Sequence, residues 1–133
     1  MWYNYVRKFR GDCRSVNTDY IISLKVQKHY EPRASYEVLL VLKDADNITL
    51  YSGDELICKL VYHYYKYLID FGFSSIDEEY LMSIKKQCFD DIKKKYDVTS
   101  SYELRKDYIR DIVDKYRRKI YSDLYKRWSD NER

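Results

Sequence analysis

The stretch ITLYSGDELICKLVYHYYKYLIDFG, residues 48–72, divides the chain into a half that favours strands and a half that favours helices. It begins with a short β-prone run, Ile48–Tyr51, and continues to residue 71 with apolar residues at helical spacing. Between the two runs, Ser52-Gly53-Asp54-Glu55 matches the capping box that begins many helices, with the serine as the predicted cap. Gly72 is suited to end the helix in a left-handed conformation. The stretch therefore predicts a switch from sheet to helix near residue 54.

Before this switch, apolar residues recur at a period of two, which is typical of strands. The first predicted strand covers residues 20–27, and its apolar face carries Tyr20, Ile22, Leu24 and Val26. A second strand, over residues 36–42, is apolar on both faces, so we expect it at the centre of the sheet. The aromatic N-terminus, Trp2–Phe9, predicts a fourth strand at an edge of the sheet. Gly11–Thr18 is predicted to be a polar loop.

Two further capping boxes, Ser75-Ile76-Asp77-Glu78 and Ser100-Ser101-Tyr102-Glu103, predict helices near residues 76–96 and 101–128. The helical spacing predicts these buried residues in the three helices: Ile57, Leu60, Val61, Tyr64, Leu68, Leu81, Ile84, Cys88, Ile92, Ile109, Val113, Tyr116, Ile120 and Leu124. Strands followed by a run of helices indicate the α+β class. We expect a single α+β domain over residues 1–133, in which a small antiparallel sheet of three or four strands from the N-terminal half packs against three helices from the C-terminal half.

Tyrosine dominates the composition, with seventeen tyrosines against three glycines and one proline. The net charge of +3 is unevenly distributed, because residues 1–33 and 93–133 are basic whereas residues 34–92 are acidic. Such asymmetry can mark a basic binding face, and the simpler alternative is that the segments neutralise one another in the fold. In residue usage and size the chain resembles the small accessory proteins of low-GC bacteriophages and viruses. That group includes inhibitors of host defence systems.

The location of the protein is predicted from its apolar runs and its cysteines. The longest apolar run, Val38–Leu42, is far too short to span a membrane, and the first residues do not resemble a signal peptide. Cys13, Cys58 and Cys88 are odd in number and lack the spacing of a metal site, which favours reduced thiols. We therefore expect an intracellular, cytoplasmic protein without membrane partners, in the host cytoplasm if it is viral.

The residues needed for catalysis or metal binding are scattered. His29 and His63 are the only candidates for a base at neutral pH, and neither has a nucleophile at a recognisable spacing. The sequence contains no C-x-x-C or H-x-x-x-H pair for zinc and no glycine-rich loop for phosphate. We therefore predict that the protein is not an enzyme, with no catalytic residue, no metal site and no cofactor.

Surplus aromatic residues supply the candidate binding positions. Tyrosine is common at interface hot spots because its large apolar ring carries a polar tip and loses little rotamer entropy. The candidate contact residues are Trp2, Tyr3, Tyr5, Arg7, Lys8 and Arg10 in the N-terminal strand, and Tyr62, Tyr65, Tyr121 and Tyr125 in the helices. The N-terminal set combines rings with cations on an edge strand, which suits an acidic partner strand. A purely structural role, in which the surplus tyrosines cover the seams between helices, is the alternative.

These features predict a protein-binding module whose partner is another protein or a second copy of the chain. The resemblance in composition and size predicts a phage- or virus-type inhibitor or regulator of a larger host machine, such as a CRISPR effector. In that role, acidic residues within 44–55 and 77–79 would compete for a basic nucleic-acid channel. The alternative function is direct nucleic-acid binding through the basic and aromatic N-terminal strand and the last helix, with rings stacked on bases and cations on phosphates.

Overall fold

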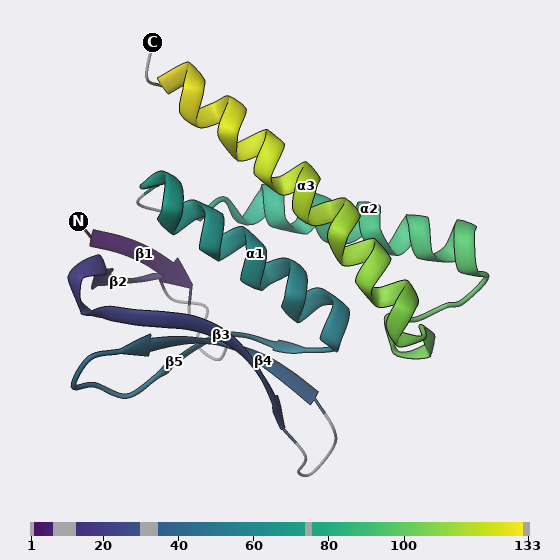
Figure 1. Cartoon of the computed structure of the whole chain (residues 1–133), viewed down its shortest axis with the longest axis horizontal. Coiled ribbons are helices and arrows are strands. Elements are labelled where there is room, and N and C mark those ends of the chain that lie inside the picture. Colours follow the sequence, from purple (N-terminus) through teal and green to yellow (C-terminus); the bar gives the residue numbers. More distant parts are fainter. Residues whose placement is uncertain (1, 7–12, 30–34, 74–75, 132–133) are drawn as a thin grey trace.

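The computed structural model describes residues 2–6, 13–29, 35–73 and 76–131 (Figure 1). Its strands are β1 (Trp2–Val6), β2 (Cys13–Asn17), β3 (Ile21–His29), β4 (Ser35–Leu42) and β5 (Ile48–Gly53). Its helices are α1 (Glu55–Phe71), α2 (Glu78–Tyr96) and α3 (Lys106–Asn131), with short 3-10 turns η1 (Thr18–Tyr20) and η2 (Ser101–Glu103). A three-stranded antiparallel sheet in the N-terminal half and three helices in the C-terminal half confirm the predicted α+β arrangement.

The three-stranded sheet has the order β3-β4-β5, with β4 at its centre as predicted. The middle of β4 is buried on both faces, because Val38, Leu39 and Leu40 are 0%, 6% and 0% exposed. All neighbouring pairs in this sheet are antiparallel. Consecutive apolar residues suit the central strand, because its side chains are buried on both faces of the sheet and it pairs with a neighbour on each side.

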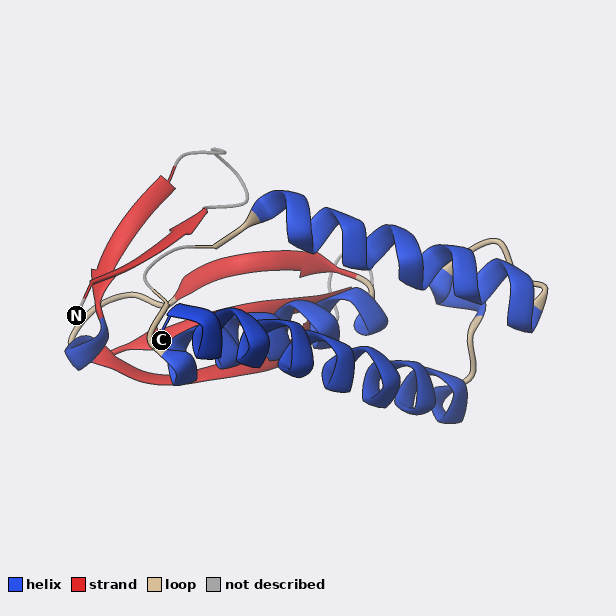
Figure 2. Cartoon of the chain, turned by 90° about the horizontal axis from the view of Figure 1, so that it is seen from above, coloured by secondary structure: helices blue, strands red, loops and turns tan. Residues whose placement is uncertain are grey.

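The N-terminal strand forms a separate two-stranded sheet, so its predicted place as a fourth strand at the edge of the larger sheet was wrong. β1 pairs with β2, with Trp2 opposite Asn17 and Val6 opposite Cys13, and Figure 2 shows the pair apart from the larger sheet. The predicted polar loop over Gly11–Thr18 is therefore wrong at Cys13–Asn17. Polar residues suit an antiparallel ribbon, because backbone hydrogen bonds hold the strands together even where a face is not apolar.

A β-bulge near the start of β3 changes which side chains face the core. Relative to β4, the register shifts between Ile21 and Ser23, which inserts one residue into the alternation. Leu24 packs against the core as predicted, and so does Ile21, whereas Ile22 is 64% exposed. Tyr20, which lies in η1 before the strand, is 55% exposed. The predicted buried face was wrong at Tyr20 and Ile22, because a shift of one residue moves side chains to the opposite face.

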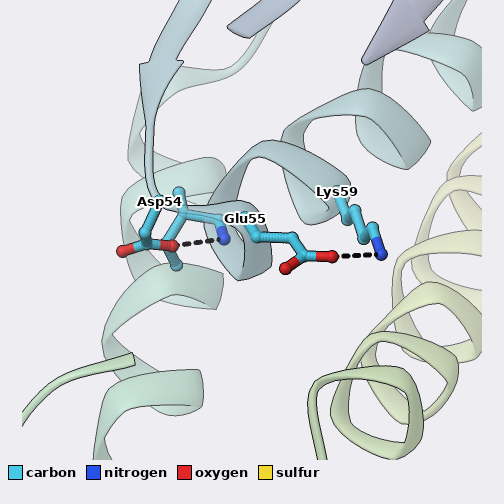
Figure 3. Close-up of polar contacts among 4 residues, drawn as sticks. Asp54, Glu55 and Lys59 are labelled. Atoms are coloured by element: carbon cyan, nitrogen blue, oxygen red, sulfur yellow. Dashed lines mark hydrogen bonds and ion pairs between the residues drawn. The ribbon is translucent and has the colours of Figure 1, made fainter. Parts of the chain in front are cut away.

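Helix α1 begins two residues later than the capping box predicts. Its N-cap is Asp54, whose Oδ1 accepts a hydrogen bond from the backbone N–H of Ile57 at 2.8 Å, and Glu55 pairs with Lys59 at 2.8 Å (Figure 3). Ser52 belongs to β5, opposite Glu37, and its backbone is therefore held by the sheet. An aspartate is as good a cap as a serine, so the aspartate nearer the helix takes the role.

The other two helix starts also differ from the capping-box prediction. The N-cap of α2 is Asp77, which accepts from the N–H of Tyr80 at 3.1 Å. Ser100 caps only the 3-10 turn η2, and α3 begins at Lys106. The predicted end of α1 is confirmed, because Gly72 follows the helix with φ of 80°. The helices are therefore predicted correctly as elements, while their first residues depend on which side chain reaches the free N–H groups.

Helix α1 is the central element of the fold. It contacts all three strands of the larger sheet as well as α2 and α3, and Figure 1 shows it between the sheet and the other helices. Every predicted buried residue of the three helices is at most 9% exposed. One side of α1 covers the sheet and another side packs against α3. Side chains along the contact between α1 and α3 that do not point into the core therefore lie at the surface of the protein.

Candidate binding surface

Helices α1 and α3 run side by side in the same direction, and their adjoining faces form the surface that we name the α1–α3 seam (Figure 1). From α1 the seam contains Glu55, Lys59, His63, Tyr67 and Phe71; from α3 it contains Lys106, Arg110, Asp114, Arg117, Tyr121, Tyr125 and Trp128. A spacing of four residues keeps side chains on one face of a helix. The seam is charged where both helices begin and aromatic where both end.

The aromatic end of the seam consists of Tyr67, Phe71, Tyr121, Tyr125 and Trp128. Phe71 lies 5.4 Å from Tyr121 and 5.9 Å from Trp128, measured between ring centroids. Tyr121 and Tyr125 are stacked at 6.2 Å with an interplanar angle of 19°. They are nonetheless 47% and 49% exposed. Their rings are therefore positioned by neighbours and still expose about half of their surface to solvent.

Arginines border this aromatic end. Tyr67, Tyr121, Arg117 and Arg118 line a hollow of about 290 Å³. Asp114 pairs with Arg117 at 2.6 Å and with Arg118 at 3.1 Å. The hydrogen bond from Arg117 lowers the pKa of Asp114 and in turn raises the pKa of Arg117. Tyrosine beside arginine is the composition of interface hot spots, and the shared carboxylate fixes where both guanidinium groups lie.

The charged end of the seam is a groove of about 460 Å³ between the two helices. Its lining includes Lys59, Lys106, Arg110 and the neutral side chains of His63 and Val113. Figure 3 shows the ion pair between Lys59 and Glu55, which neutralises one of these cations. The groove and the aromatic end are continuous, because the ring of His63 is stacked on Tyr67 at 6.0 Å.

His63 is an uncharged polar residue inside the seam. Among the residues that the structure describes, its buried Nδ1 finds no hydrogen-bond partner. Burial lowers the pKa of His63 to about 4, and the nearby charges of Arg117 and Lys66 act in the same direction. An unsatisfied buried polar atom costs stability. The side chain of His63 is therefore favoured in the seam as the neutral imidazole, and its protonation is disfavoured.

We expect the stability of the protein to fall in mild acid because of His63. Its pKa is lowered from 6.5 to about 4, so between these values the unfolded chain binds the proton that the folded chain resists. Stability is therefore complete above pH 6.5 and is lost as the pH falls toward 4. For this partly exposed group we expect a loss of roughly 1–2 kcal/mol. Urea unfolding of the wild type and His63→Phe at neutral and acid pH measures it; an equal acid loss in both proteins would contradict the assignment.

The structure places the sequence-predicted contact residues in different environments. Tyr121 and Tyr125 lie together at the aromatic end, and half-buried Tyr62 packs its edge against His63 at 5.1 Å. Tyr65 is only 2% exposed and belongs to the core, so its expected place on the surface was wrong. The reason is that α1 is covered on several sides, which leaves less free surface than an outer helix has.

The N-terminal set is only partly within the described residues. Trp2, Tyr3 and Tyr5 lie in β1, where their backbones pair with Asn17, Val16 and Arg14 of β2. Arg7, Lys8 and Arg10 lie outside the described residues. Their role in binding stays a prediction.

Two residues of the seam are not among the candidates predicted from the sequence. Phe71 and Trp128 pack their rings against the exposed Tyr125. The signal that would have found Phe71 is the row at every fourth position of α1, from Glu55 through His63, and Trp128 continues the corresponding row of α3 through Tyr121 and Tyr125.

Other candidate chemistry is accounted for by the fold. Asp54 and Asp77 cap helices and are thereby held by backbone N–H groups. Cys58 and Cys88 are free and buried, as predicted, and burial raises the pKa of Cys88 to about 12, so it stays a thiol. Within the described ranges, no three His, Cys, Asp or Glu side chains are grouped as metal ligands would be. None of the described helices has the length and apolarity that crossing a membrane requires.

Comparison of the chain with protein-family models, with curated proteins and with solved structures finds no match.

Proposed function

We propose that the protein is a non-catalytic binding module that occupies a surface of a larger protein through the aromatic end of the α1–α3 seam. The observation that carries this proposal is the pair Tyr121 and Tyr125, stacked on one another and still about half exposed. The ring of Phe71 contacts both tyrosines and that of Trp128 contacts Tyr125, so little side-chain entropy is lost when a partner covers the pair. Anchors of this kind contribute most of the free energy at protein interfaces.

The charges around the aromatic end favour a protein partner over a nucleic acid. Residues 114–131 contain six basic and three acidic side chains, so positive charge is only moderately in excess. Asp114 already binds Arg117 and Arg118, and Asp123 lies 3.5 Å from Lys119. Carboxylates at these positions would repel a phosphate backbone. Direct nucleic-acid binding is the second candidate, because stacked exposed tyrosines can also receive bases.

The composition extends the proposal to an inhibitor or regulator of a larger host machine, such as a CRISPR effector, acting in the host cytoplasm. Its resemblance in size and residue usage to phage and viral accessory proteins supports this role. The two buried free thiols, Cys58 and Cys88, suit a reducing compartment. In this role the protein acts by covering a surface that the machine needs.

Affinity capture from a host lysate tests the proposal. We expect a protein to be recovered after nuclease treatment, with an affinity that changes less than about threefold between 50 and 200 mM salt, because aromatic contacts are weakly screened. Binding to several phosphates would instead fall by about a thousandfold over the same range. Recovery of nucleic acid alone, lost on nuclease treatment, would contradict the proposal. Sedimentation of the purified chain identifies a second copy as the partner if its mass doubles with concentration.

A further inference from the structure

We infer that the charged end of the α1–α3 seam binds the carboxylates of an acidic segment of the partner protein, and that it thereby fixes the direction in which the partner lies on the two helices. The inference rests on the proposed function, because it assigns chemistry to the surface that continues the aromatic end. The groove that would receive the segment measures about 460 Å³ and lies between α1 and α3.

The first argument is the balance of charge in the groove. Each of its three acids already has a cation: Glu55 binds Lys59 at 2.8 Å, Asp107 binds Arg105 at 3.0 Å and Asp114 binds Arg117 at 2.6 Å. Lys106 and Arg110 also line the groove, and within the described part of the chain neither has an ion pair. Two cations are therefore available to an external anion.

The second argument is the electrostatic field inside the groove. His63 lines it and is held neutral mainly by burial, and the charges of Arg117, Lys66 and Lys59 also oppose a further positive charge there. Asp114 acts in the opposite direction, but its contribution is smaller than those of Arg117 and Lys66. Burial itself disfavours any charge, but the part of the effect that comes from Arg117 and Lys66 reflects a positive potential, which favours a carboxylate at the exposed cations of the groove.

The third argument is continuity with the aromatic end. The ring of His63 is stacked on Tyr67, and Tyr67 meets Tyr121 edge-on at 5.2 Å. A chain lying along the seam therefore passes from cations to rings without leaving the surface. Nucleic acid fits this arrangement less well, because its phosphates recur at every nucleotide, whereas the groove offers two cations without an ion pair among the described residues.

The length of the seam predicts the spacing of the partner's residues. Tyr121 follows Arg110 by eleven positions on α3, which at 1.5 Å per residue is about 16 Å. An extended peptide covers about 3.3 Å per residue. We therefore expect the partner segment to carry its acidic residues about five positions from an aromatic or aliphatic anchor.

Peptide titration followed by NMR of the labelled full-length protein tests the inference. The probe is a synthetic peptide with one tryptophan, a Gly/Ser spacer of about five residues and a run of glutamates; two matched peptides replace the glutamates by lysines or shorten the spacer to one residue. We expect the glutamate peptide to shift the amide signals of Arg110 and Tyr121 together. It should bind about tenfold more tightly than either matched peptide, because two exposed charge contacts are gained together with the anchor.

Charge-reversal variants show which cations cause the preference for the glutamate peptide. Lys106→Glu with Arg110→Glu is expected to remove the preference for glutamate over lysine. Lys86→Glu with Lys93→Glu, which makes the same change of charge at exposed positions of α2, should leave it intact. If both double variants reduce the preference equally, overall charge explains it and the inference is overturned.

The remaining outcomes separate this inference from the proposed function. Equal affinity for the glutamate and lysine peptides, with signals shifting only around Tyr121, overturns the acidic segment and leaves the aromatic anchor in place. The absence of any shift with the glutamate peptide also overturns the inference. Tighter binding of a single-stranded oligonucleotide at Lys106 and Arg110 would overturn it in favour of nucleic acid. The proposed function fails by a different result, namely partner capture that does not depend on Tyr121 and Tyr125.

Discussion

Replacing Tyr121 and Tyr125 together by alanine is expected to weaken binding of the captured partner by at least about 100-fold, since each aromatic anchor contributes roughly 2 kcal/mol or more. The fold should be retained, because both side chains are about half exposed and lie on a helix in which alanine is favourable. Calorimetric titration of the wild type and the double variant measures the affinity, and thermal unfolding checks the fold.

Tyr102→Ala is the matched control for this experiment. Tyr102 is 72% exposed and lies in η2, outside the aromatic end of the seam, so its replacement should change partner affinity less than about threefold. If the double variant binds as tightly as the Tyr102 variant, the aromatic end does not carry the interaction.

Tyr64→Ala is expected to cost about 3–5 kcal/mol of unfolding free energy, the largest stability effect that we predict for a single tyrosine. Tyr64 is fully buried in α1, and its ring lies 5.6 Å from that of Tyr80. Its hydroxyl accepts a hydrogen bond from the backbone N–H of Asp77 at 2.8 Å. The residue therefore joins the central helix to the cap of α2.

Tyr64→Phe separates the hydroxyl from the ring. It keeps the packing but leaves the N–H of Asp77 without this acceptor, so we expect a cost of about 1–3 kcal/mol. Urea unfolding of both variants gives the two values. A loss below about 1 kcal/mol in Tyr64→Ala would mean that the junction of α1 and α2 is not packed as described.

The helices were predictable from the sequence because their apolar stripes are long and regular. The stripe from Leu81 to Ile92 and the stripe from Ile109 to Leu124 are buried as predicted. The caps were less predictable, because Ser52 and Asp54 are both good cap residues two positions apart and the sheet binds the backbone of the first. Competition of this kind between neighbouring residues is settled by tertiary contacts.

The strands were less predictable from the sequence than the helices. The bulge between Ile21 and Ser23 cannot be recognised in an apolar alternation, yet it leaves Ile22 exposed, while Tyr20 lies in η1 before the strand begins. Strand β2 was not predicted because Cys13–Asn17 is largely polar and becomes a strand by pairing with β1. Backbone hydrogen bonds between distant segments leave little trace in local composition.

The aromatic end of the seam was predictable in its residue types but not in its place. The surplus of tyrosines led us to expect an interface, which stays a prediction, and Tyr121 and Tyr125 were among the candidate residues. Their neighbour Phe71 comes from a helix fifty positions earlier, and only the parallel packing of α1 and α3 brings these rings together. Tyr65 has the same composition signal but lies in the core, because the central helix has less free surface.

Hydroxyl-radical footprinting of the protein with and without its captured partner tests most directly that the aromatic end of the seam is the contact surface. We predict that oxidation of Tyr121, Tyr125 and Trp128 falls on binding, while the exposed side chains of Met82 and Tyr102 react as before. Protection within Trp2–Tyr5 or at Met82, with Tyr121 and Tyr125 unchanged, would contradict the account and move the interface to another face of the protein.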